Sequence, residues 1–134
     1  MLRRIGATLA GMLLAFAVIV IVEMIGNALY PLPPGVDPKN PESIARAMRN
    51  VPAAALIVVV IGWTAGALLG SWLAARIARS VWPAVIVGAL VVCGAVANML
   101  TIPHPLWMWI SSLVLVALVT LAGAGLGSRG RASS

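Results

Sequence analysis

Four long apolar stretches constrain the fold of this chain more than any other feature. They run over about residues 5–30, 52–75, 81–101 and 106–127 and contain one acidic residue, Glu23. A helix needs about 20 apolar residues to cross the hydrocarbon core of a bilayer, and each stretch is long enough. Because helices satisfy their own backbone hydrogen bonds in lipid, we expect an all-α fold, a four-helix transmembrane bundle.

The composition agrees with lipid as the solvent. The chain is 62% hydrophobic and 9% charged, whereas about a quarter of the residues of a soluble protein are charged. We therefore expect a single integral membrane domain over residues 1–134, with membrane lipid as a partner. The net charge of +6 indicates contact with lipid headgroups. Since no aromatic residues alternate with the basic ones, we expect no nucleic-acid partner.

Four spans place alternate loops on opposite sides of the membrane, and the basic residues are divided unequally between these two sides. The positive-inside rule predicts that the side with more of them is cytoplasmic. Both termini should then be cytoplasmic, and the segments 31–51 and 102–105 should face outward. We expect a multi-pass protein of the bacterial inner membrane in this orientation. The outer loop holds three basic residues, Lys39, Arg46 and Arg49, and the inner side holds six, Arg3, Arg4, Arg76, Arg79, Arg129 and Arg131.

The first outer loop is predicted to contain a short helix. The prolines from Pro31 to Pro34 end the first span and favour extended backbone. Asn40, Pro41 and Glu42 then form a typical helix start, with an N-cap, a proline at the first position and an early acid. We expect a helix from Pro41 to about Arg49 that lies along the outer interface. The alternative is a solvated loop helix without lipid contact.

A polar stripe on the first span is the main candidate for a functional site. Glu23, Asn27 and Tyr30 are spaced i, i+4, i+7 and therefore share one helix face. Asn98 and His104 are predicted to lie at the same depth, so all five residues could converge on an outward-facing proton or ligand site. An ionisable group in a membrane span is by default a functional hypothesis. The alternative is a structural hydrogen bond between helices, which contributes about 0.6–2 kcal/mol.

Glycines repeat every four residues on the second span. Gly62, Gly66 and Gly70 form this ridge, and Gly123 and Gly127 repeat the spacing on the fourth span. Small residues at this spacing allow helix backbones to approach closely. We expect close packing there, either within the chain or between protomers.

No arrangement of residues in the sequence indicates catalysis or a cofactor. His104 is the only histidine and Cys93 is the only cysteine, whereas metal sites usually need several such ligands. The scattered hydroxyl residues do not combine with a histidine and a carboxylate as a nucleophile requires. We therefore expect no metal, no cofactor and no enzymatic activity.

Three segments resemble a group of uncharacterised small bacterial four-span integral membrane proteins. They are YPLPPGVDP, GWTAGALLGSWLAARIA and NMLTIPHPLWMW, and the likeness covers most of the chain after Glu23. The nine-residue segment VEMIGNALY resembles the region around the membrane glutamate of the small multidrug resistance transporters. Those proteins are four-span dimers, and this resemblance implies that Glu23 binds protons and cations.

The sequence leaves three hypotheses about function. The first is a non-enzymatic membrane protein that works through association, as a homo-oligomer or as an accessory subunit of a membrane protein partner. The glycine ridge favours it, and the scarcity of polar lining argues against a pore. The second is a small proton-coupled transporter that uses Glu23. The third is a membrane enzyme that handles lipids or quinones.

Overall fold

The computed structural model describes residues 1–129, and all regular structure in that part of the chain is helical. The predicted all-α bundle is confirmed. Each long helix begins and ends within three residues of the span expected from hydropathy, and the loop helix is also present. The helices are α1 (Leu2–Leu29), α2 (Pro41–Met48), α3 (Ala53–Ala78), α4 (Trp82–Thr101) and α5 (Leu106–Ser128).

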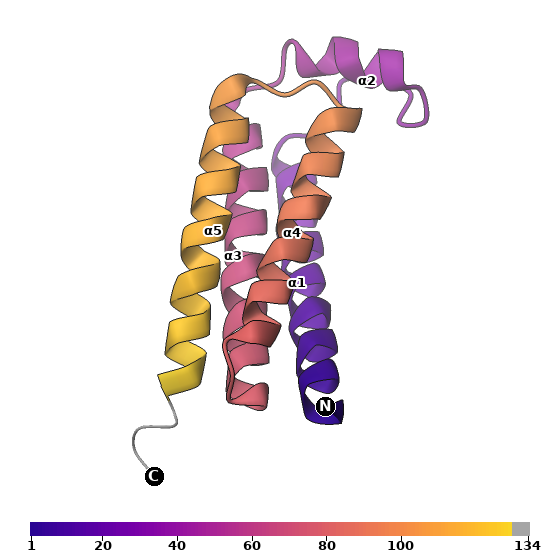
Figure 1. Cartoon of the computed structure of the whole chain (residues 1–134). Helices are drawn as coiled ribbons and strands as arrows, with labels where there is room; N and C mark the ends of the chain where they lie inside the picture. Colours follow the sequence, from indigo (N-terminus) through magenta and orange to yellow (C-terminus); the bar gives the residue numbers. More distant parts are fainter. Residues whose placement is uncertain (130–134) are drawn as a thin grey trace.

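The four long helices run up and down side by side, and α2 lies across one end of the bundle (Figure 1). All four are long and apolar enough to cross a membrane, so the chain is a multi-pass membrane protein. Leu13, Ile61, Leu118 and Leu121 are among the many large apolar side chains on the outside of the bundle. In a bilayer these side chains face lipid rather than water.

Helix α3 is the centre of the bundle and packs against α1, α4 and α5. Its glycine ridge lies against α1 of the same chain. A Cβ atom at Gly66 would be 2.9 Å from the Ala15 carbonyl oxygen, and one at Gly70 would be 2.6 Å from that of Gly11. On the other side of α3, Gly123 and Gly127 of α5 face the backbone of Leu68 and Trp72. Both sets of glycines therefore serve packing within the chain.

Local hydrogen bonds shape the loop that carries α2. The Asn40 side chain accepts a hydrogen bond from the Glu42 amide at 3.0 Å and caps the helix, and Pro41 follows at its first position. The Asp37 amide donates to the Ser43 hydroxyl at 3.0 Å and holds the preceding turn against α2. Only four residues, 49–52, connect α2 to α3. This short connection keeps α2 over the end of the bundle, where Ala47 is buried.

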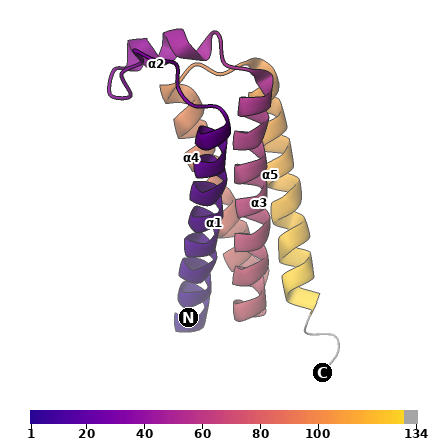
Figure 2. The same ribbon diagram turned by 180° about the vertical axis from the view of Figure 1, so that it is seen from behind.

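Helices α1 and α4 contact each other less extensively than either contacts α3. Seen from behind, α1 and α3 stand side by side in front of α4 and α5 (Figure 2). Three cavities follow the boundary between α1 and α4: one beneath α2, one at mid-height and one at the opposite end. That opposite end carries the arginines expected on the inner side, except Arg131, which lies outside the described residues.

Candidate functional site

The cavity beneath α2 brings together all five polar residues that the sequence singled out. It has a volume of about 300 Å³, and its walls come from α1, α2, α3, α4 and the adjoining loops. Helix α1 contributes two of the polar residues, the position just after α1 contributes one, α4 contributes one and the loop between α4 and α5 contributes one. They are Glu23, Asn27, Tyr30, Asn98 and His104.

The α1 residues reach the cavity because of their helical spacing and the close approach of α1 to α3. Gly26 lies between Glu23 and Asn27, and a Cβ atom there would be 3.0 Å from the Val58 side chain. The absence of a side chain at Gly26 thus lets this turn of α1 approach α3. Glu23 is half-buried, six residues before the end of α1, which corresponds to about 9 Å along the helix axis. Tyr30, just beyond the helix, is 38% exposed.

The α4 side of the site is built around the end of that helix. The Asn98 carbonyl oxygen accepts a hydrogen bond from the Ile102 amide at 3.0 Å, so Asn98 lies in the last turn of α4. Thr101, three residues further along α4, does not line the cavity, and its hydroxyl donates a hydrogen bond to the Ala97 carbonyl oxygen at 2.7 Å.

His104 is held between Pro103 and Pro105. Its Nδ1 atom donates a hydrogen bond to the Ile102 carbonyl oxygen, which leaves Nε2 available to another partner. His104 also lines a neighbouring cavity of about 490 Å³ that includes Arg49 and Trp107. This ring could therefore exchange a hydrogen bond with a molecule in either cavity.

Within residues 1–129, His104 is the only one of the five whose side chain hydrogen-bonds to another protein group. Glu23 and Asn98 line the same cavity without a hydrogen bond between them in this part of the chain. A structural hydrogen bond between α1 and α4 at this point is therefore not made. The polar atoms remain available to a bound molecule, which is the arrangement that small-molecule sites use: an apolar cavity with a few convergent polar groups.

The apolar walls of the cavity were not foreseen from the sequence. Ile44 and Met48 of α2 and Leu56 and Val59 of α3 line it. The apolar face of α2 had suggested contact with the membrane interface. The signal that could have placed α2 near the cavity is its four-residue connection to α3, which keeps the end of α2 close to the start of α3.

A second cavity of about 300 Å³ lies next to the first, toward the middle of the bundle. It shares Glu23 and Asn98 with the first cavity and is otherwise lined by apolar residues, including Phe16 and Trp63. Gly94 also lines it, and a Cβ atom there would have no neighbour within 4 Å. Glu23 therefore lies where a polar cavity meets an apolar one.

Residues 1–129 contain no group of three or more His, Cys, Asp or Glu side chains that could hold a metal ion. Cys93 is exposed on α4. No protein-family model, curated protein or solved structure matches the chain.

Proposed function

We propose that this protein is a non-enzymatic integral membrane protein that binds a small amphipathic cation or weak base at Glu23. The observation that supports this most is the convergence of five polar residues from three parts of the chain on one largely apolar cavity. The carboxylate of Glu23 provides the negative charge, and the amides of Asn27 and Asn98 provide hydrogen bonds. The apolar walls and the second cavity accommodate the hydrocarbon part of the ligand.

The same geometry supports the finer proposal of a small proton-coupled transporter. A membrane carboxylate that binds either a proton or a cationic ligand can exchange one for the other, which is the basis of proton-coupled transport. Association between copies has less support, because the glycine ridge packs against α1 within the chain. We further propose that the protein lies in a bacterial inner membrane with both termini cytoplasmic, since most of its arginines gather at the end opposite α2.

Binding of tetraphenylphosphonium, a hydrophobic cation, to the purified protein tests the proposed site. Glu23→Gln keeps the shape and hydrogen-bonding capacity of the side chain but removes its charge. We expect the affinity to fall about tenfold or more, which corresponds to about 1.4 kcal/mol, because the variant loses the charge attraction between the Glu23 carboxylate and the cation. Isothermal titration calorimetry would measure this change in affinity.

Glu42→Gln is the matched control, because it removes one negative charge from the exposed start of α2, outside the cavity. Equal affinities for the wild type and Glu23→Gln, or equal losses in both variants, would contradict the site. The transport step is tested separately in liposomes that contain a pH-sensitive dye. Proton movement driven by the cation should require Glu23; binding without such movement would leave a binding protein and exclude the transporter.

A further inference from the structure

The end of the bundle opposite α2 contains a strongly basic cavity that the Glu23 site does not involve. It has a volume of about 710 Å³ and lies where α1 begins, α3 turns into α4 and α5 ends. All three acidic residues of the chain, Glu23, Asp37 and Glu42, lie on the α2 side, so none of them neutralises this cavity. Its polar and aromatic lining consists of Arg3, Arg4, Arg79, Ser80, Trp82 and Ser128.

The end of α3 positions two of the arginines, Arg3 and Arg79. The Nε atom of Arg3 donates a hydrogen bond of 2.6 Å to the Ile77 carbonyl oxygen near the end of α3, which leaves its two terminal nitrogens available. Arg79 ends α3 in the left-handed conformation, with φ of 54°. Glycine occupies this conformation without steric cost and is the usual residue there. An arginine at this position keeps a positive charge at the cavity at a conformational cost that glycine would avoid.

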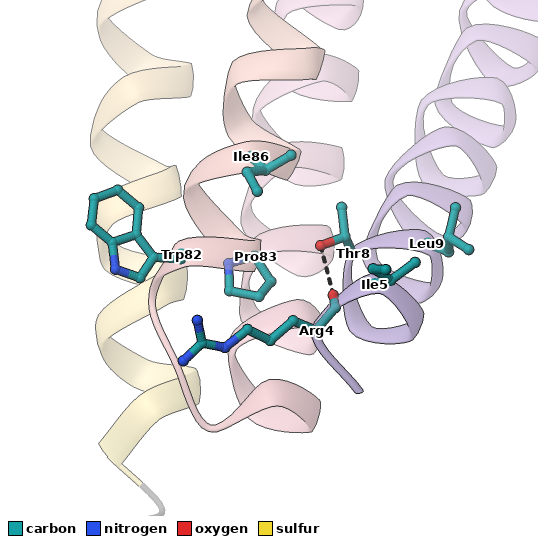
Figure 3. A pocket seen from close by; sticks show the side chains of 7 residues that line it. All are labelled: Arg4, Ile5, Thr8, Leu9, Trp82, Pro83 and Ile86. Carbon is teal, nitrogen blue, oxygen red and sulfur yellow. Dashed lines mark hydrogen bonds between the residues drawn. The ribbon is translucent and has the colours of Figure 1, made fainter. Parts of the chain in front are cut away.

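An apolar groove continues from the basic cavity along α1 and α4. This adjoining cavity of about 360 Å³ shares Arg4 and Trp82 with the basic one. Figure 3 shows the Arg4 side chain reaching from α1 toward Pro83, with Ile86 farther along α4. The Thr8 hydroxyl in this groove donates to the Arg4 carbonyl oxygen at 2.9 Å, so it is satisfied within α1. The groove beyond the arginines is therefore apolar.

We propose that this end of the bundle binds one anionic phospholipid from the leaflet that it faces. The phosphate and the anionic headgroup lie among Arg3, Arg4 and Arg79, and one acyl chain lies in the groove between α1 and α4. Basic pockets between membrane helices are known to hold anionic headgroups. A free phosphate would leave the apolar groove empty, and a zwitterionic lipid would leave the net positive charge of the cavity uncompensated. The proposal does not depend on the function of the Glu23 cavity.

Titration of detergent-purified protein with phosphatidylglycerol, followed by native mass spectrometry, tests the headgroup contacts. Arg4→Gln and Arg79→Gly should each weaken the binding of phosphatidylglycerol about fivefold. The binding of phosphatidylcholine to the same variants serves as the reference. Arg129→Gln is the matched control, because it removes the same charge at the same end of the bundle from a residue that does not line the cavity. It should leave the affinity unchanged.

Arg79→Gly also separates binding from folding. Glycine adopts the left-handed backbone at this position without strain. Without lipid, the variant should therefore melt at the wild-type temperature or above it. Its affinity for phosphatidylglycerol should nevertheless fall. Equal losses in all three variants would show a general surface-charge effect and would overturn the site. Equal stabilisation of the wild type by glycerol phosphate would show that the cavity takes a soluble anion instead.

Brominated acyl chains test the groove. Trp82 lines both cavities and is 64% exposed, so phosphatidylglycerol with brominated chains should quench its fluorescence. Comparison with Trp82→Phe isolates this contribution from those of the other tryptophans. Brominated phosphatidylcholine should quench the Trp82 component much less at equal concentration. Equal quenching by both lipids would indicate ordinary bilayer contact and would overturn the proposal.

Discussion

At the scale of single residues, Glu23 is distinguished by the two cavities that it borders. A carboxylate in a membrane span costs free energy unless other groups or water solvate it, and the cost decreases toward the interface. Glu23 is half-buried and borders two cavities, with Asn98 as a polar neighbour at both. Such a position suits a group that receives a ligand. Gly94, which also borders the second cavity, leaves room for the apolar part of that ligand.

Gly94→Leu should weaken tetraphenylphosphonium binding several-fold, because the new side chain would occupy the second cavity. It should not harm the fold, since a Cβ atom at Gly94 meets nothing within 4 Å. Replacing a glycine inside a helix also stabilises that helix by up to about 1 kcal/mol. Gly125→Leu is the control, because Gly125 is equally free of neighbours but lies on α5. Titration calorimetry and thermal unfolding of both variants check this. Unchanged affinity in Gly94→Leu would mean that the ligand does not reach the second cavity.

At the scale of helices, the packing of α1 on α3 determines where the site lies. Gly11, Ala15 and Gly26 of α1 meet small or branched residues of α3 along most of the shared length. The sequence predicted the extent of each helix because membrane thickness limits its length. It could not predict that α3 lies at the centre, because the glycine spacing indicates close packing without naming the partner. Trp63, in the middle of α3, is 4% exposed and belongs to the core.

Gly66→Leu should destabilise the protein by about 1–3 kcal/mol or more, because overpacking forces side chains and backbone apart. Its Cβ atom alone would lie 2.7 Å from the Ile19 side chain and 2.9 Å from the Ala15 carbonyl oxygen. Thermal unfolding in detergent measures this loss, and Gly6→Leu, where a Cβ atom has no neighbour within 4 Å, is the control. Equal melting temperatures would mean that α1 and α3 do not pack as described. Size-exclusion chromatography should show an unchanged oligomer size.

At the scale of the whole molecule, the two ends of the bundle differ in chemistry. The α2 end holds the carboxylate-bearing cavity, and the opposite end holds a cavity with three arginines. The sequence predicted the convergence of Glu23 with Asn98, because helical period and span length together fix depth. It did not predict that α2 lies over that cavity, since the position of α2 relative to α3 depends on a short loop rather than on a periodic pattern. The asymmetry of charge also predicts how the molecule lies in a membrane.

We expect the end with the arginines to be cytoplasmic, because basic residues are retained on that side during insertion. Single cysteines at Asp37, in the loop before α2, and at Ser133, beyond the described residues, report the two sides. The background variant is Cys93→Ala, which removes the native thiol. An impermeant thiol reagent should label the cysteine at 37 in intact cells and the one at 133 only after permeabilisation. The opposite pattern would reverse the orientation, place the Glu23 cavity toward the cytoplasm and make the phospholipid site face the outer leaflet.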